Sequence, residues 1–343
     1  MSTLSRRSLA TAAVALSALA AAPALADPAP RITGPFAHAN LAVYFVHGAS
    51  APGKAPLTLQ EALARKLVVV HETGDVNRLA IENRGGEEVF VQSGDIVKGG
   101  QQDRVLTVSL MLPPRSGRVP IAAFCVEQGR WAARGAEDVK SFATADAAVP
   151  SRDAKLAMKA PLAAGGNVRA ETAQRQSGVW ATVAETQDKL SRSLGAPVAA
   201  MESRSSLQLA LENGKVGAER AATATALRPA GESDADIVGY VFAVNGRLNS
   251  ADAYPSNALF RKMWPKLLDA AATEAIGERA AAAAPPPSAA DVAAFLAAAE
   301  GGKATRTTLE RSIVLETRDA DRALFFETSR ADGSWFHRNY LAK

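Results

Sequence analysis

The residues best suited to chemistry form two polar clusters, Gly99–Arg104 and Glu127–Trp131, within the stretch from Val89 to Trp131. Arginine forks bind carboxylates and phosphates, a tryptophan ring can stack on a flat ligand, and glycines let a ligand approach the backbone closely. These residue types favour a site for a small anionic molecule. Its expected ligand-binding residues are Gly99, Gly100, Gln101, Arg104, Gln128, Arg130 and Trp131.

The same clusters hold two carboxylates that could take part in a reaction. Glu127 could act as general base or acid, with Arg104 and Arg130 stabilising developing negative charge, and Asp103 is a second catalytic candidate. Arginine neighbours normally keep a carboxyl group ionised, which makes a poor general acid, and they weaken a metal site. Three functions stay open: a binding module, which is favoured; a hydrolase or transferase; and a structural or partner-binding protein.

Other kinds of site find little support in the sequence. The single cysteine, Cys125, lies in an apolar run, which is typical of a buried and inert thiol. The four histidines are scattered and lack the spacing of a metal site. No P-loop, Rossmann fingerprint, G-x-S-x-G or H-E-x-x-H motif occurs. We therefore expect no cofactor and no metal.

Two strands are expected to bring the polar clusters together. From Asp103 to Leu112 apolar residues alternate with others, as in a strand with one face in a core and Arg104 at its rim. A turn at Ser116-Gly117 leads into a second apolar strand from Val119 to Val126. Strands joined by so short a connection are most simply antiparallel. Gln101–Arg104 and Glu127–Trp131 should then meet at one end of a sheet.

The rest of the chain combines strand and helix patterns. A buried strand is expected at Leu41–His47, a long helix at Asn167–Leu194, a loop-rich passage at Gly214–Asp236 and a hairpin at Asn245-Gly246. A second long helix follows Ser256 and runs to Gly277. We expect an α+β fold: a mainly antiparallel β-sheet or sandwich packed against two long helices, with a small C-terminal β appendage.

The chain is expected to divide into four parts. Residues 1–26 resemble a signal peptide, with Arg6-Arg7, an apolar stretch and an Ala24-Leu25-Ala26 cleavage site; a twin-arginine signal stays open. Residues 27–279 form the main domain, residues 280–304 an alanine- and proline-rich linker with a short helix, and residues 305–343 the β appendage. The signal peptide predicts a periplasmic or secreted protein.

Charge and hydropathy narrow the range of partners. The formal net charge is +4 and no lysine- or arginine-rich block occurs, so no nucleic-acid partner is expected. After the signal peptide no stretch is apolar enough to cross a bilayer, so we expect no integral membrane segment and a soluble mature protein. The oligomeric state does not follow from the sequence.

The two polar clusters also carry a family resemblance. Gly99–Leu106 and Cys125–Trp131 resemble the ARG and rhodanese-phosphatase-superfamily-associated protein (ARPP) domain, and so do the Gln176–Leu190 helix and the Asn245-Gly246 hairpin with the helix after it. The resemblance covers about Leu41 to Glu278. Members often have Gln-Asn-Arg where this chain has Gln102-Asp103-Arg104. The family is named for neighbouring domains, and that context implies ADP-ribose, nucleotide or phosphate chemistry without an established activity.

Overall fold

The computed structural model describes residues 30–130, 140, 142–159, 167–280 and 284–343. Its architecture is α+β, as expected, and is built on large antiparallel sheets. Within the described residues, no helix combines the length and the apolar composition needed to cross a bilayer.

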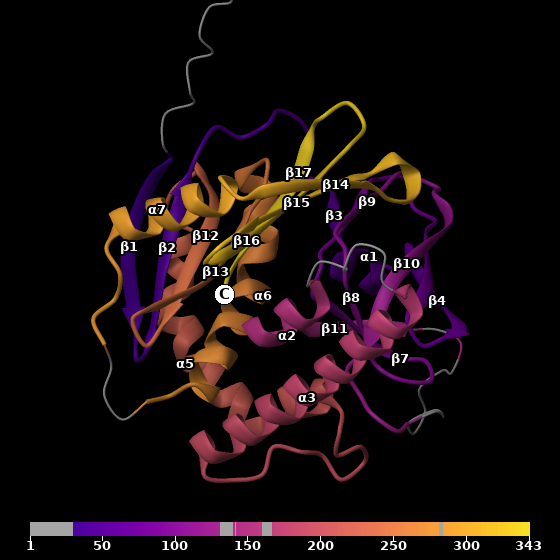
Figure 1. The fold of residues 1–343 in the computed structure, drawn as a ribbon, viewed down its shortest axis with the longest axis horizontal. Helices are drawn as coiled ribbons and strands as arrows, with labels where there is room; N and C mark the ends of the chain where they lie inside the picture. The colour runs from indigo at the N-terminus through magenta and orange to yellow at the C-terminus, as the bar shows by residue number, and fades with distance from the viewer. Residues whose placement is uncertain (1–29, 131–139, 141, 160–166, 281–283) are drawn as a thin grey trace, which may run out of the picture.

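An eight-stranded antiparallel sheet joins the first strands of the chain to the last ones (Figure 1). β2 pairs with β12, so segments about 200 residues apart lie side by side. Asn245 and Gly246 form the expected hairpin, both with positive φ. In order across the sheet, the strands are β1 (Arg31–His38), β2 (Leu41–His47), β12 (Ile237–Val244), β13 (Arg247–Ala253), β17 (Trp335–Ala342), β16 (Ala323–Ser329), β15 (Val314–Ala320) and β14 (Lys303–Thr308).

Two smaller sheets are built from the segment between β2 and the long central helix. The six-stranded sheet has the order β11 (Phe142–Ala148), β7 (Asp95–Gly99), β8 (Arg104–Leu106), β10 (Gly117–Cys125), β5 (Arg78–Asn83) and β4 (Val68–Asp75). The three-stranded sheet has the order β3 (Leu57–Thr58), β6 (Val89–Val91) and β9 (Leu110–Leu112). Only the β3–β6 pair among the described strands is parallel.

Helices cover both faces of the eight-stranded sheet. α6 (Asn257–Gly277) places Phe260 and Trp264 against Phe45 and Tyr240 on one face. On the other face α7 (Ala289–Glu300) lies across the strands, with Val292, Leu296 and Ala299 in a separate apolar cluster (Figure 1). The other helices are α1 (Leu59–Ala64), α2 (Arg152–Lys159), α3 (Val168–Leu194), α4 (Leu207–Leu211), α5 (Gly214–Gly231) and the 3-10 turn η1 (Glu310–Ser312).

Several boundaries follow from capping chemistry that the sequence displays. Asn167 and Ser256 cap the N-termini of α3 and α6 through their side chains, at the expected positions. Gly195 ends α3 in the left-handed conformation, which costs glycine little because it has no Cβ.

Two expectations about local structure are wrong. Gly214–Gly231 is helix α5 and not a loop-rich passage; its alanines, threonines and glycines leave only a sparse apolar stripe. The strand expected over Asp103–Leu112 is two strands, β8 and β9, which belong to different sheets and are separated by Thr107–Ser109. Ser109, which lies in this interruption, is buried.

The C-terminal strands expected as a small appendage continue the large sheet. Ser250 to Ala253 of β13 pair with Arg338 to Leu341 of β17, and β16, β15 and β14 follow outward. In Figure 1 these strands lie above α2 and α3. Side chains of β14–β17 line one wall of a cavity.

Candidate functional site

The pairing of β8 with β10 brings the two predicted polar clusters together, as expected. β8 pairs antiparallel with β10, and Arg104 lies opposite Cys125. The side chains of Gln101–Arg104 therefore meet those of Glu127–Arg130; we call this group the QQDR cluster. Trp131, which was expected to stack on a ligand, lies outside the described residues.

The charged centre of the QQDR cluster is buried. Asp103, Arg104 and Glu127 each have 0% of their surface exposed, so Arg104 is not at the rim of the sheet. Glu127 Oε2 accepts the backbone N–H of Asp103 (3.1 Å) and lies 2.7 Å from Nε of Arg130. Asp103 accepts the N–H of Gly99 (3.0 Å) and the hydroxyl of Ser206 (3.0 Å). The carboxylates thus join β7, β8 and the N-terminus of α4.

Arg104 extends the same network toward β4. Its Nη1 donates to the Gln102 carbonyl (2.8 Å), and its Nη2 lies 3.6 Å from Oε2 of Glu72. The same Glu72 oxygen accepts the N–H of Gln101 (3.3 Å). Gln102 donates to the carbonyl of Glu127 (3.0 Å). These bonds are internal to the protein, so the described part of the cluster acts as a polar connection between strands.

Gly99 and Gly100, which precede the QQDR cluster, make contacts that hold the fold. The carbonyls of Gly99 and Gly100 accept from Arg130, at 3.3 and 3.2 Å. Gly100 has φ +55°, and a Cβ added there would overlap the ring of Phe142. The close approach that Gly100 permits is therefore made by Phe142 from β11.

The Gly100→Ala variant is expected to lose about 2 kcal/mol or more of unfolding free energy, because left-handed strain and overpacking add. Gly129→Ala is the matched control: Gly129 also has positive φ (+86°), but an added Cβ would meet no described atom within 4 Å. Urea unfolding of both variants separates the two causes. Equal losses would show that the contact with Phe142 costs nothing.

The other predicted residues lie at the edge of the cluster. Gln128 is exposed, and its carbonyl accepts the hydroxyl of Ser205 (2.6 Å). Gln101 is partly exposed and lines a cavity of about 480 Å³ with His71, Arg118 and Lys140. Cys125 is buried, as expected, and burial raises the pKa of its thiol to about 12. It is therefore no nucleophile near neutral pH.

A larger cavity of about 660 Å³ lies between helices α2 and α3 and the inward face of β14–β17. Among the described residues that line it are three cationic side chains, those of Lys159, Arg175 and Lys303, and one carboxylate, Asp319. Asp319 itself pairs with Lys343. Further walls come from apolar and hydroxyl side chains, namely Met158, Leu315, Phe326, Thr305, Thr307, Thr317 and Thr328. We call this space the α2–β14 cavity.

Lys159 has an unusual environment in the α2–β14 cavity. Burial lowers its pKa to about 7, with Lys155 adding to this effect and Asp252 opposing it. Its ammonium donates to Oδ1 of Asn339 (2.6 Å) and lies 4.5 Å from the centre of the Phe326 ring. An anion bound beside it would favour the protonated form.

A chain of hydrogen bonds reaches the cavity wall from the core. Oγ of Ser109 lies 2.9 Å from Nδ1 of His337, and Nε2 of His337 lies 3.0 Å from Oδ1 of Asp252. Ser109 and His337 line the cavity, whereas Asp252 lies behind them. Burial lowers the pKa of His337, although Asp252 opposes it, so the imidazole is neutral near pH 7. The sequence contained no signal for this contact, which spans 228 positions.

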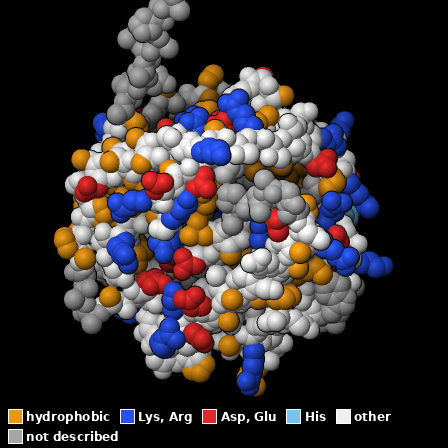
Figure 2. Space-filling view, in the orientation of Figure 1, with side chains coloured by type: hydrophobic (Ala, Val, Ile, Leu, Met, Phe, Trp, Pro, Cys, Tyr) orange, Lys and Arg blue, Asp and Glu red, His pale blue; other side chains and the backbone are white. Residues whose placement is uncertain are grey.

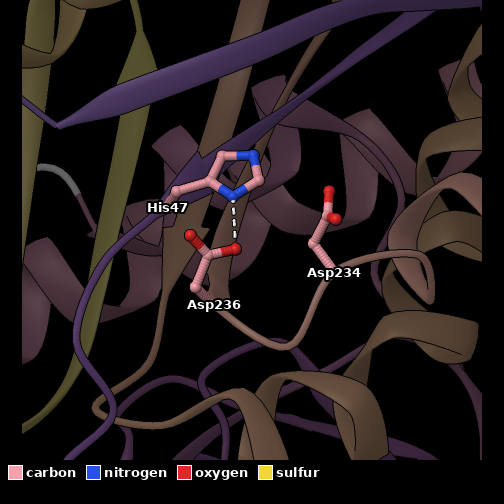
Figure 3. A group of neighbouring side chains, drawn as sticks. All are labelled: His47, Asp234 and Asp236. Carbon is pink, nitrogen blue, oxygen red and sulfur yellow. Dashed lines mark hydrogen bonds and ion pairs between the residues drawn. The ribbon is translucent and has the colours of Figure 1, made fainter.

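His47, Asp234 and Asp236 combine ligand types that could hold a metal ion. His47 at the end of β2 faces Asp236 and Asp234 from the segment before β12, and their ligand atoms lie within 4.8 Å of one another (Figure 3). However, Nη2 of Arg31 lies 2.6 Å from Nδ1 of His47 and 2.7 Å from Oδ2 of Asp236. Nε2 of His47 is engaged by Thr33 (2.8 Å). A guanidinium so close disfavours a cation, so these residues do not fit one.

Positive and negative side chains intermingle on the face of the molecule drawn in Figure 2.

Comparisons with known proteins identify a family but no activity. A family model described as "ARG and Rhodanese-Phosphatase-superfamily-associated Protein domain" matches residues 30–341. This match includes the C-terminal strands, beyond the stretch on which the sequence resemblance was based. Neither the curated proteins nor the solved structures gave a match.

Proposed function

The chain belongs to the ARG and Rhodanese-Phosphatase-superfamily-associated Protein domain family, and on that premise we propose that it binds a small anionic molecule in the α2–β14 cavity. One observation carries this proposal: Lys159, Arg175 and Lys303 line a single cavity beside one carboxylate. A volume of about 660 Å³ lies within the range of small-molecule sites.

The chemistry of the lining supports an anion with an apolar part. Arg175 offers a planar fork suited to carboxylate or phosphate, and Lys159 and Lys303 act as point charges. Phe326, Leu315 and Met158 supply apolar contact, while threonine hydroxyls can donate to the remaining oxygens. An ordinary lysine is strongly hydrated, whereas Lys159 is partly buried, and this burial lowers its pKa. Binding an anion there requires less further desolvation.

A thermal-shift screen tests this function. We expect one class among phosphate, nucleotides, ADP-ribose and dicarboxylates to stabilise the wild type, by about 2.7 kcal/mol at 100 times its Kd. The Lys159→Met and Lys303→Met variants should lose most of that gain. Lys215→Met, which changes an exposed lysine of α5, is the control and should keep it. A gain of equal size in all four proteins would place the ligand elsewhere.

The edge of the QQDR cluster is a second candidate place for the anion. The cavity of about 480 Å³ at Gln101 is also lined by Arg118 and Lys140. An Arg118→Met variant that abolishes the stabilisation, with Lys159→Met unchanged, would favour this place. The buried centre of the cluster supports the third function considered from the sequence, a structural one. Glu127 has no exposed surface and accepts from internal donors, so we assign Glu127 and Asp103 to holding the fold.

We also propose that residues 1–26 are an export signal. Residues 1–26 fall outside the described residues, and the proposal rests on their sequence pattern. Expression of the full chain followed by N-terminal sequencing tests it: cleavage after Ala26 is expected. An uncleaved chain that stays in the cytoplasm would overturn it.

A further inference from the structure

We propose that Ser109, His337 and Asp252 form a nucleophilic relay that hydrolyses carboxylic esters carrying an anionic group. The inference rests on the proposed function, since the ester would occupy the α2–β14 cavity. The relay spans three segments distant in the chain: the connection between β8 and β9, β13 and β17.

The first support is the direction of the hydrogen bonds. The hydroxyl oxygen of Ser109 accepts the N–H of Ser93 (3.0 Å), so its own hydrogen is directed to Nδ1 of His337 (2.9 Å). Nδ1 is then an acceptor, and the ring hydrogen is on Nε2, which donates to Asp252 (3.0 Å). A hydroxyl that donates to a neutral imidazole, itself oriented by a carboxylate, is the arrangement needed to activate serine.

The second support is the way the carboxylate is held. Asp252 Oδ1 also accepts from Nδ2 of Asn339 (2.9 Å), and Oδ1 of Asn339 accepts from Lys159 (2.6 Å). Although burial pushes the pKa of Asp252 upward, the hydrogen bond from His337 and the positive charges of Lys155 and Lys159 bring it below the ordinary value. The carboxylate is therefore charged and can stabilise the imidazolium that forms during reaction.

The third support is access to a ligand space. Ser109 and His337 line the same cavity as Lys159, Arg175 and Lys303. A buried serine–histidine bond with only a structural role has no need to reach a cavity lined by cations. The cations select an ester with a negative group, and Ser109 and His337, 2% and 3% exposed, belong to the wall of the space that such an ester would fill.

The reaction balances with water as the only co-reactant. Ser109 Oγ attacks the carbonyl carbon, and its proton passes to Nδ1 of His337. The imidazolium then gives this proton to the leaving oxygen, the C–O bond breaks and the alcohol departs. Water attacks the acyl-serine by the same route, releasing the acid and restoring Ser109. In the usual serine–histidine–aspartate triad Nε2 faces the serine and Nδ1 the aspartate, whereas here Nδ1 faces Ser109 and Nε2 faces Asp252. Either ring nitrogen can accept or donate a proton, so the reversed orientation allows the same proton transfer.

The test uses residues 27–343. The substrates are p-nitrophenyl acetate and the p-nitrophenyl half-ester of succinate, and a fluorophosphonate probe labels the nucleophile. We expect hydrolysis of the half-ester to exceed that of the acetate, and the probe to add once, on Ser109, with loss of fluoride. Ser109→Ala should lower the rate at least 100-fold and abolish the adduct. Ser177→Ala, which changes an exposed serine of α3, should leave both unchanged.

Removing the Ser109 hydroxyl could lower stability, so peptide mapping of the labelled wild type gives the decisive result independently. An adduct on another residue, no adduct, or full activity in a folded Ser109→Ala protein would overturn the inference. Anion binding is measured in parallel by thermal shift. Binding without hydrolysis refutes only the relay. Hydrolysis of both esters at equal rates, without anion binding, supports Ser109 as the nucleophile but overturns both its preference for anionic esters and the proposed binding function.

Discussion

The Asp103→Ala variant is expected to lose about 3–5 kcal/mol of unfolding free energy, because it removes one member of a buried ionic network. Asp103 has no exposed surface, and its carboxylate lies 3.5 Å from Nη2 of Arg130. It also accepts from the N–H of Gly99 and the hydroxyl of Ser206. The alanine leaves these donors without their acceptor, and each buried donor left unsatisfied costs about 1–3 kcal/mol.

Urea unfolding followed by circular dichroism checks this expectation, and the melting temperature should fall by on the order of 10 °C. Gln128→Ala is the matched control, because Gln128 belongs to the same cluster but is exposed; its effect should stay within about 0.5 kcal/mol. If Asp103→Ala were as stable as this control, the cluster would not hold the fold, and a role in ligand binding would become the better explanation.

The sequence predicted the parts of this region that depend on local pattern. Alternation and a short turn were enough to place the two polar clusters at one end of a sheet, where Arg104 lies opposite Cys125, because two strands joined by few residues have one simple way to pair. They could not show that Arg104 is buried. Its burial depends on Glu72 of β4, more than thirty positions earlier, whose carboxylate lies 3.6 Å from the guanidinium.

The α2–β14 cavity could not be predicted for a related reason. Its wall requires the C-terminal strands to join the sheet through β17 and β13, and register between distant strands leaves no mark in a single sequence. The contact between Ser109 and His337 further requires the strand to break at Thr107–Ser109, where alternation predicted a continuous strand. α5 was missed because small residues give a helix little apolar periodicity.

A buried ion pair connects the two larger sheets and their helices. Nζ of Lys266 on α6 lies 2.5 Å from Oδ1 of Asp95, the first residue of β7. Lys266 is 8% and Asp95 2% exposed. The other carboxylate oxygen accepts the N–H of Gln92 (3.0 Å), whose side chain accepts from Tyr254 (2.5 Å). The pair thus links the helix packed on the eight-stranded sheet to an inner strand of the six-stranded sheet.

Lys266→Met is expected to cost about 3–5 kcal/mol, because it leaves the Asp95 carboxylate buried without its cation. Lys262→Met on the same helix removes a more exposed pair with Glu61 and should cost less than about 1 kcal/mol. The double variant Asp95→Asn/Lys266→Met removes both charges, so it should regain part of the loss. Equilibrium unfolding followed by tryptophan fluorescence, which reports on Trp264 of α6 among others, and by circular dichroism gives all these values. If the double variant were less stable than Lys266→Met alone, the carboxylate would stabilise the fold without its lysine, and the link between the sheets would depend on Gln92 and Tyr254.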